Sequence, residues 1–362
     1  MTRRPPADDN ASFKEMYRRY ILKKIAFVVV CVAASVACAG FELAAGSYGI
    51  GFKEALSIIS DHLSGNLPTD TWELVKHNIV WEDRLPRTIA AFAVGITLGV
   101  CGAAMQSSMR NPLADPYTTG ISSGASLGAT VSIILGWSVL PGLFGNSALV
   151  INAFVFSLIP ATIIIVISMF KRNVSPTTMI LIGIAVMYLF TAVTTFLKLT
   201  ASEEELARIY MWNVGSIGSA SWENVGLMCL AAAIGLVSIQ CMSRKLNLLA
   251  MSDPCAVSLG MDPKRVRLAG LVIVSFVTAV IVSFTGTIGF VGLVAPHVAR
   301  MFLGSDNRYL VPASAAFGAV LMLVSDVVAK NIGTGLPVGA ITAVIGGPLF
   351  ILLLMKQQRS AW

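Results

Sequence analysis

Two arginines in the stretch WEDRLPRTIAAFAVG are spaced for binding carboxylates. Arg84 and Arg87 lie three residues apart on either side of Pro86, at the start of a long apolar run. Residues three apart share roughly one face of a helix, and a guanidinium can bind a carboxylate through two parallel hydrogen bonds. The pair therefore indicates a docking point for acidic residues of another protein. Two other interpretations stay open: the arginines anchor the end of an apolar helix, or Glu82 and Asp83 neutralise them locally.

The other residues that could do chemistry do not form a recognisable active site. The chain has three histidines, His62, His77 and His297, which share no metal-ligand spacing, and it has neither an H-E-x-x-H nor a G-x-S-x-G motif. The sequence also contains no phosphate-binding G-x-x-x-x-G-K-[ST] loop. We therefore expect no enzyme and no metal site. Any ATP-driven work would require a nucleotide-binding partner subunit.

Ionisable residues inside the apolar runs are few, which bears on ion-coupled transport. Glu42, Lys198 and Asp326 lie toward the ends of predicted helices. Charged groups in mid-membrane are costly unless they serve as ion or proton sites, whereas groups near helix ends can reach the interface. Interfacial anchoring or a local helix-end contact is favoured for these three residues, and coupling-ion chemistry is the alternative.

The segment RNPLADP lies between two apolar runs and contains two turn signals, Asn111–Pro112 and Asp115–Pro116. Glycines recur at every fourth position on either side of it: Gly95, Gly99, Gly120, Gly124 and Gly128. Such spacing allows helices to pack closely. Irregular backbone at membrane depth must be buried in protein or line a water-filled passage. The turn therefore favours a pore constriction.

The segment 243–267 is predicted to form short helices. Asp253 is placed to cap one of them with Pro254 at its first position, Gly260 is placed to end it, and Asp262 starts the next turn. Its apolar residues are expected to be exposed: Leu248, Leu249, Met251, Val257 and Leu259. This surface fits the docking of another protein or contact with the bilayer surface.

The composition shows which elements must position these residues. Of 362 residues, 56% are hydrophobic and 12% are charged, far from a soluble globular average. A bilayer core of about 30 Å needs roughly 20 apolar residues per helix. We place a break at TGTIG, 285–289, because the uncharged run around it is too long for one span. The sequence thus predicts an all-α polytopic membrane protein with ten spans, at 25–47, 88–109, 117–140, 147–170, 177–197, 224–242, 268–286, 288–304, 310–329 and 336–355.

The lysines and arginines predict the orientation. Most of the 26 fall in segments that lie inside when the N-terminus is cytoplasmic, as short cytoplasmic loops require. We therefore expect a cytoplasmic tail at 1–24, one membrane domain at 25–356 and a cytoplasmic tail at 357–362. Within the domain, 48–87 is an outer segment and 243–267 a cytoplasmic loop. The net charge of +7 is mostly topogenic, so membrane lipid is the expected contact and nucleic acid is not.

Four stretches together resemble one protein family. They are RLPRTIAAFAVGITLGVCGAAMQSSMRNPLADPYTTGISSGASLGA, WNVGSIGSASW, GTIGFVGLVAPHVARMF and LPVGAITAVIGGPLFILLL. From about residue 50 to residue 356 the chain resembles FecCD-type (type II) ABC importer permeases, which serve uptake of iron–siderophore complexes, haem and vitamin B12. The resemblance implies a ten-helix permease in a bacterial or archaeal cytoplasmic membrane that works by alternating access.

The resemblance also implies partners. They are a second permease copy or a sister permease, two cytoplasmic ATPase subunits that bind ATP and Mg, and an extracytoplasmic binding protein that delivers substrate. The chain itself is expected to bind no cofactor. A ferric siderophore is the favoured substrate on family frequency, with haem and cobalamin as alternatives. An ion-gradient-driven secondary carrier and a membrane receptor without transport are the rival functions.

The resemblance assigns roles to individual positions. Arg84 and Arg87 match outward arginines that meet acidic residues of the binding protein. Lys330 falls where some members carry a third arginine, although lysine lacks the bidentate fork. Asn111 and Leu113 match the inner-gate turn. The remaining assignments are a second gate segment at Ser175, Pro176 and Thr177, and ATPase-coupling positions at Asp253, Pro254, Val257, Leu259 and Gly260.

Overall fold

The computed structural model describes residues 7–46, 48–171, 174–332 and 336–357. Within these ranges the regular structure is entirely helical. Seven segments are long and apolar enough to cross a membrane, and three apolar helices are shorter. The ten helices concerned are α1 (Ala7–Ala44), α4 (Leu85–Met109), α5 (Ile121–Leu135), α6 (Gly145–Phe170), α7 (Pro176–Lys198), α9 (Trp222–Met251), α11 (Pro263–Thr285), α12 (Val291–Leu303), α13 (Asn307–Ile332) and α14 (Val338–Gln357). They coincide with the ten predicted spans, which confirms the fold class.

The long uncharged run is divided where the sequence predicted. Helix α11 ends at Thr285 and α12 begins at Val291. Gly286 between them has a φ of +69°, and a Cβ there would meet the carbonyl group of Trp212. Only glycine suits both conditions. The turn therefore requires Gly286, one of the two glycines from which it was predicted.

Helix α4 is the centre of the bundle, with α9, α11, α12 and α13 packed around it. The glycines at every fourth position make the expected close approaches. A Cβ on Gly95 or Gly99 would collide with the backbone of α13, and a Cβ on Gly124 or Gly128 would collide with the backbone of α6. The backbones therefore pack directly against one another, as small residues allow.

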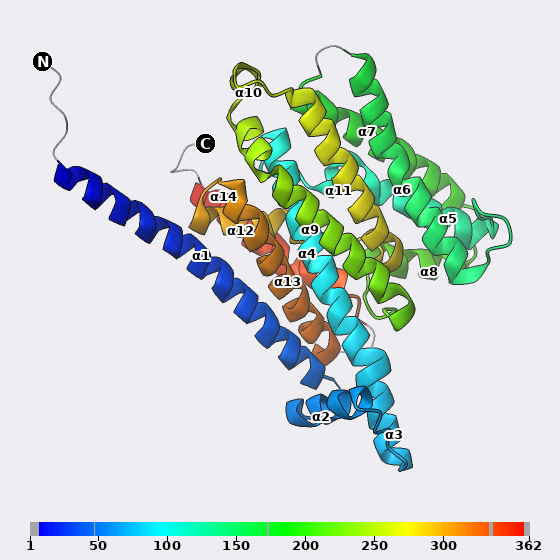
Figure 1. Ribbon diagram of the computed structural model, residues 1–362. Helices are drawn as coiled ribbons and strands as arrows, with labels where there is room; N and C mark the ends of the chain where they lie inside the picture. Colours follow the sequence, from blue (N-terminus) through cyan, green and yellow to red (C-terminus); the bar gives the residue numbers. More distant parts are fainter. Residues whose placement is uncertain (1–6, 47, 172–173, 333–335, 358–362) are drawn as a thin grey trace, which may run out of the picture.

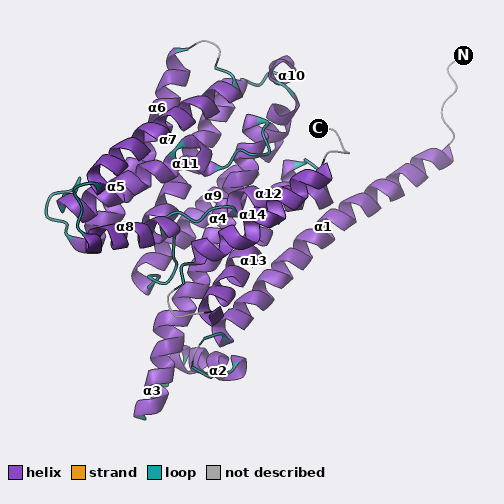
Figure 2. Cartoon of the chain, turned by 180° about the vertical axis from the view of Figure 1, so that it is seen from behind, coloured by secondary structure: helices purple, strands orange, loops and turns teal. Residues whose placement is uncertain are grey.

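The bundle has two distinct ends. Helices α2 (Phe52–Leu63) and α3 (Thr71–Asn78) lie at one end, and α10 (Asp253–Ser258) lies at the other (Figure 1). Helix α1 packs along α13, but its first half stands clear of the bundle in both views (Figures 1 and 2). The described part of the predicted tail, from Ala7 onward, is thus the first part of α1.

Four further elements lie between the apolar helices or extend them. A π-helical segment, η1 (Ile79–Arg84), joins α3 to α4 without a break, and η2 (Pro116–Thr119) is a 3-10 turn before α5. Helix α8 (Glu203–Val214) follows α7, and α10 follows α9. Two of these short elements carry residues to which a function was assigned: η1 carries Arg84, and α10 carries Asp253, Pro254 and Val257.

Candidate functional site

Arg84 is not on an exposed surface. It is the last residue of η1, its side chain is only 3% exposed, and its guanidinium donates to the carbonyl oxygens of Leu43 at 2.8 Å and Tyr48 at 2.9 Å. These contacts fix the chain where it leaves α1. The expectation of an exposed arginine pair is therefore wrong for Arg84, because its donors serve backbone carbonyls. Its role in docking stays a prediction.

Arg87 faces a different partner from Arg84. Its Nε and Nη2 atoms bind the two carboxylate oxygens of Asp326 in α13, at 2.9 and 2.7 Å. The Nζ atom of Lys330 lies 3.1 Å from a Glu42 carboxylate oxygen and 3.3 Å from an Asp326 oxygen. We refer to Glu42, Arg87, Asp326 and Lys330 as the buried charge cluster, since both carboxylates are fully buried and Lys330 is 9% exposed.

The buried charge cluster joins α1, α4 and α13 at the end that carries α2 and α3. Two cations face two carboxylates, and each carboxylate lies within ion-pair distance of a cation. The helix-end contact predicted for Glu42 and Asp326 is thus confirmed. Lys198 also has a local contact, with its Nζ 5.3 Å from the ring centre of Tyr210. Docking by Arg87 and Lys330 stays a prediction, and Arg87, at 17%, keeps the larger exposed fraction.

The RNPLADP turn is compact and has an apolar tip. Arg110 ends α4 in the left-handed conformation, with φ 49°, and the Asn111 side-chain oxygen accepts from the backbone N–H of Leu113 at 2.9 Å. Asp115 caps η2 by accepting from Thr118 N–H at 2.9 Å. The Leu113 side chain is 49% exposed. This geometry presents a leucine on a braced turn, and its function as a gate stays a prediction.

The second predicted gate segment is the beginning of α7. Ser175 caps the helix by accepting from the backbone N–H of Thr178 at 3.1 Å, and Pro176 occupies the first turn. Pro176 is buried, whereas Ser175 and Thr177 are exposed. Residues 172 and 173, which precede this segment, lie outside the described residues.

The segment 243–267 differs from the expected pair of short helices. Helix α9 continues through Met251, because the sequence up to that point contains no helix-breaking residue, and only α10 is separate. Ser252, rather than Asp253, caps α10 by accepting from Cys255 N–H. The predicted stop is confirmed, since Gly260 follows α10 with φ +77°; Asp262 caps α11.

Helix α10 presents an apolar surface at the end of the bundle. Met251, Val257 and Leu259 are 66%, 61% and 62% exposed. Leu249 was expected there as well but is fully buried, because it lies on the inner face of the continued α9. Asp253 turns inward: one of its carboxylate oxygens lies 2.8 Å from Arg267 and 3.1 Å from Arg110. Four predicted coupling positions, Pro254, Val257, Leu259 and Gly260, are therefore exposed, and the fifth, Asp253, contacts the neighbour of the gate turn.

A polar cluster near the start of α13 was not predicted. Asp306 accepts from the Arg308 guanidinium at 2.7 Å and from the Asn247 side chain at 2.8 Å. The arginine hydrogen bond lowers the pKa of Asp306 to about 2. Asn307 donates to Asn247 at 2.7 Å. Its side-chain oxygen accepts from Ser107 of α4 at 2.8 Å. This cluster ties α9, α13 and α4 together.

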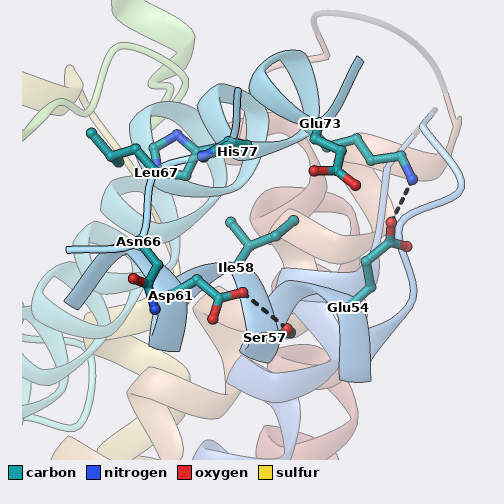
Figure 3. Close-up of a pocket in the computed structure, with 10 residues that line it drawn as sticks. Glu54, Ser57, Ile58, Asp61, Asn66, Leu67, Glu73 and His77 are labelled. Atoms are coloured by element: carbon teal, nitrogen blue, oxygen red, sulfur yellow. Dashed lines mark hydrogen bonds and ion pairs between the residues drawn. The ribbon is translucent and has the colours of Figure 1, made fainter. Parts of the chain in front are cut away.

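The outer segment forms a pocket that the sequence did not reveal. Helices α2 and α3 enclose about 450 Å³, lined by Glu54, Ser57, Ile58, Asp61, Asn66, Leu67, Pro68, Glu73, Lys76 and His77. Lys76 binds Glu54 at 2.5 Å and thereby lowers the pKa of that carboxyl. Ile58 points into the space between the two helices (Figure 3). Asp70, which caps α3, is the residue from which the start of this helix, and so the α2–α3 pair, could have been predicted.

The whole chain has close relatives. It matches the FecCD transport family over residues 27–356. It is 35% identical over 353 residues to a protein of Methanocaldococcus jannaschii named as an ABC transporter permease, covering 95% of this chain and 98% of the relative. It is 33% identical over 295 residues to the iron(3+)-hydroxamate import permease FhuB of Bacillus subtilis, covering 81% and 74%. It is 33% identical over 294 residues to the vitamin B12 import permease BtuC of Citrobacter koseri, covering 81% and 87%.

A solved structure shares the architecture. A metal-chelate type ABC transporter in an inward-facing conformation matches with a TM-score of 0.78 and 27% identity, over 91% of this chain and 98% of that one. The family match includes both predicted gate segments and α10. The resemblance seen in four stretches of sequence is thereby confirmed. The chain belongs to the FecCD transport family and is a multi-pass membrane permease of the ABC importer type.

Proposed function

We propose that this chain is the permease subunit of an ATP-driven importer that moves a ferric siderophore across the cytoplasmic membrane, delivered by an extracytoplasmic binding protein. The observation that carries the proposal is the family match over residues 27–356. Glu42 and Asp326, two buried carboxylates that a secondary carrier could use, are instead held in contacts with Lys330 and Arg87.

The α10 end fits contact with an ATPase subunit. Val257 and Leu259 expose apolar side chains on a short helix outside the bundle (Figure 1), and a buried apolar contact of this kind can dominate an interface. In the proposed complex two ATPase subunits bind ATP and Mg, and this chain binds no cofactor. The chain pairs with a second permease copy or a sister permease. Both termini and α10 then lie in the cytoplasm.

The α2–α3 end faces the binding protein in this arrangement. Arg84 supports the surface from within, since it fixes the exit of α1. Arg87 and the exposed residues of the hairpin remain for contact. The gate works by alternating access: nucleotide binding moves α10, and the turn that carries Asn111 and Leu113 opens or closes the passage. Ser175 and Thr177 form the second side of the constriction.

The relatives and the composition support a proposal for the substrate class. One relative serves iron(3+)-hydroxamate, another vitamin B12, and the structural neighbour is of metal-chelate type. These cargoes are bulky chelates, and a chain that is 56% hydrophobic and 12% charged suits an apolar passage for them. Ferric siderophore is our first choice, and haem and cobalamin are the alternatives. Thermal stabilisation of the cognate binding protein by ferric hydroxamate, haem or cobalamin distinguishes them.

Uptake into proteoliposomes tests the proposed function. Vesicles that hold the permease, its ATPase and external binding protein should import the stabilising ligand only with internal ATP. An ionophore should leave uptake unchanged. Uptake that continues without ATP and collapses with the ionophore would establish a secondary carrier instead.

Leu259→Asp tests the ATPase contact. A charge in an apolar seat is costly, so this variant should lose uptake and the ATPase should no longer co-purify with it. Leu63→Asp is the matched control, because Leu63 is a 75% exposed leucine at the opposite end. The control should retain the ATPase. Equal co-purification with both variants would remove α10 from the interface.

A further inference from the structure

Asp253 connects α10 to the end of α4. It is the first residue of α10, and its Oδ1 atom lies 2.8 Å from Arg267 Nη2 and 3.1 Å from Arg110 Nη2. Arg267 belongs to α11 and Arg110 ends α4. One carboxylate oxygen therefore joins α10 to α11, the next helix along the chain, and to the end of α4, which is distant in the sequence.

Arg267 extends this connection into the last turn of α4. Its side chain is 3% exposed, and its Nε donates to the carbonyl oxygen of Ser108 at 3.0 Å. Arg110 is followed directly by Asn111, whose side chain braces Leu113. Asp253 is thus linked to the end of α4 directly through Arg110 and indirectly through Arg267, and the residue after Arg110 begins the gate turn.

The same region also contacts the end of α6, which precedes the other predicted gate segment. Lys264, in the first turn of α11, donates to the carbonyl oxygens of Met169 at 3.3 Å and Lys171 at 3.1 Å. These carbonyl groups belong to the last turn and the C-cap of α6, the helix that precedes Ser175 along the chain. The loop from α10 to α11 therefore touches the backbone beside each predicted gate segment.

The exposure of Asp253 suits a contact that can change. Its side chain is 36% exposed and that of Arg110 is 32% exposed. Pairs with this degree of exposure add little to stability, yet charge-assisted hydrogen bonds are short and directional. A shared carboxylate of this kind orients two elements without locking them together.

We propose that Asp253 is a positioning residue that transmits the movement of α10 to the gate turn through Arg110 and Arg267. This inference rests on the proposed function and specifies how the ATPase contact reaches the passage. It also revises the role of Asp253, which the sequence placed on the ATPase surface. In the structure this carboxylate faces the permease itself.

Access to the gate turn can be measured without knowing the substrate. The permease–ATPase complex in nanodiscs carries Leu113→Cys as a reporter and Cys255→Ala to remove the thiol in α10. The labelling rate of the reporter by a water-soluble maleimide is compared with ATP and vanadate and without nucleotide. In the parent complex this ratio reports nucleotide-driven movement of the gate turn.

In Asp253→Asn the difference in labelling rate with and without nucleotide should shrink, so that the ratio falls at least about fivefold toward one. A factor of about five is the lower end of typical coupling between sites. The ATPase should still co-purify. Arg110→Gln should have the same effect, and the double variant should add nothing, since both act through one contact. Asp262→Asn is the matched control: it removes a carboxylate from the same loop but keeps a good helix cap. The control should behave like the parent.

An unchanged ratio in both Asp253→Asn and Arg110→Gln would overturn the inference, as would an equal loss in Asp262→Asn. A parent complex that imports with ATP but shows no nucleotide response at Leu113→Cys would overturn it too. Failure of the proposed function has a different signature, because uptake would then not depend on ATP in the unmodified complex. Arg110→Gln keeps the test decisive if Asp253→Asn does not fold.

Discussion

Two groups of carboxylates and cations lie at opposite ends of this permease and differ in burial. In the buried charge cluster, Asp326 is fully buried and binds the Arg87 fork through both oxygens. At the α10 end, Asp253 is 36% exposed, and one oxygen serves two arginines. The chemistry is nearly the same, but the surroundings differ.

Burial gives the two groups different uses. Removing one partner of a buried pair leaves an uncompensated charge, so the buried charge cluster holds α1, α4 and α13 in one arrangement. The Asp253–Arg110 pair is different, because its members are 36% and 32% exposed and breaking it returns them to water at little cost, so this contact can yield during a cycle. The permease thus has a rigid brace at the α2–α3 end and an adjustable link at the α10 end.

The largest expected effect comes from breaking the brace. Asp326→Ala should destabilise the protein by about 3–5 kcal/mol. It removes the carboxylate partner of Arg87 and one of the two carboxylate partners of Lys330, and both cations lie largely out of solvent. The check is the apparent melting temperature in detergent together with the yield of folded protein.

A double variant separates lost charge balance from lost packing. Arg87→Met with Asp326→Leu removes one cation and one anion and leaves the Lys330–Glu42 pair in place. It should recover most of the lost stability. If Asp326→Ala melts like the parent protein, the buried charge cluster is not a brace.

The next effect tests the helix contact beside the brace. Gly99→Ala would place a Cβ on the backbone of Ser314 and force α4 away from α13, at a cost of about 1–3 kcal/mol. Gly226→Ala in α9 is the control, since its Cβ would meet nothing within 4 Å. The control should be neutral or stabilised by about 0.5–1 kcal/mol, as in any helix interior. Equal melting temperatures would contradict the close approach of α4 and α13.

The sequence was sufficient to predict the apolar helices and the turn at which the longest apolar run is divided. Long apolar runs located ten apolar helices, seven of them in segments long enough to cross a membrane, and TGTIG located the turn after Thr285. Local capping rules also succeeded at Asp262, where an acidic residue precedes proline. The missed helix α8 carried a readable signal, because Ser202 and Glu205 form a capping box at its start.

The partners of the charged residues could not be predicted in this way. Arg84 and Arg87 are three residues apart, yet their partners are as distant as Leu43 and Asp326 along the chain. Which face of α4 meets which helix depends on the packing of the whole bundle. Spacing therefore identified residues with the right chemistry but not whether they face a partner protein or the permease itself.

The smallest expected effect on stability is that of Asp253→Asn. This variant best distinguishes the Asp253 contact from the buried charge cluster. Its melting temperature should shift by less than that of Asp326→Ala or Gly99→Ala, since asparagine keeps an oxygen that can accept from Arg267 and the partly exposed Asp253–Arg110 pair contributes about 0–1 kcal/mol. Salt should nevertheless act on the link. Charges are screened within about 10 Å at 0.1 M salt and about 3 Å at 1 M, so raising NaCl should reduce the nucleotide response at Leu113→Cys in the parent complex. In Asp253→Asn the remaining response should no longer depend on salt. Asp326 is fully buried, so the melting temperature set by the buried charge cluster should change little over the same range. A parent response that ignores salt would show that the Asp253 contact stays closed throughout the cycle, and would make it a second brace.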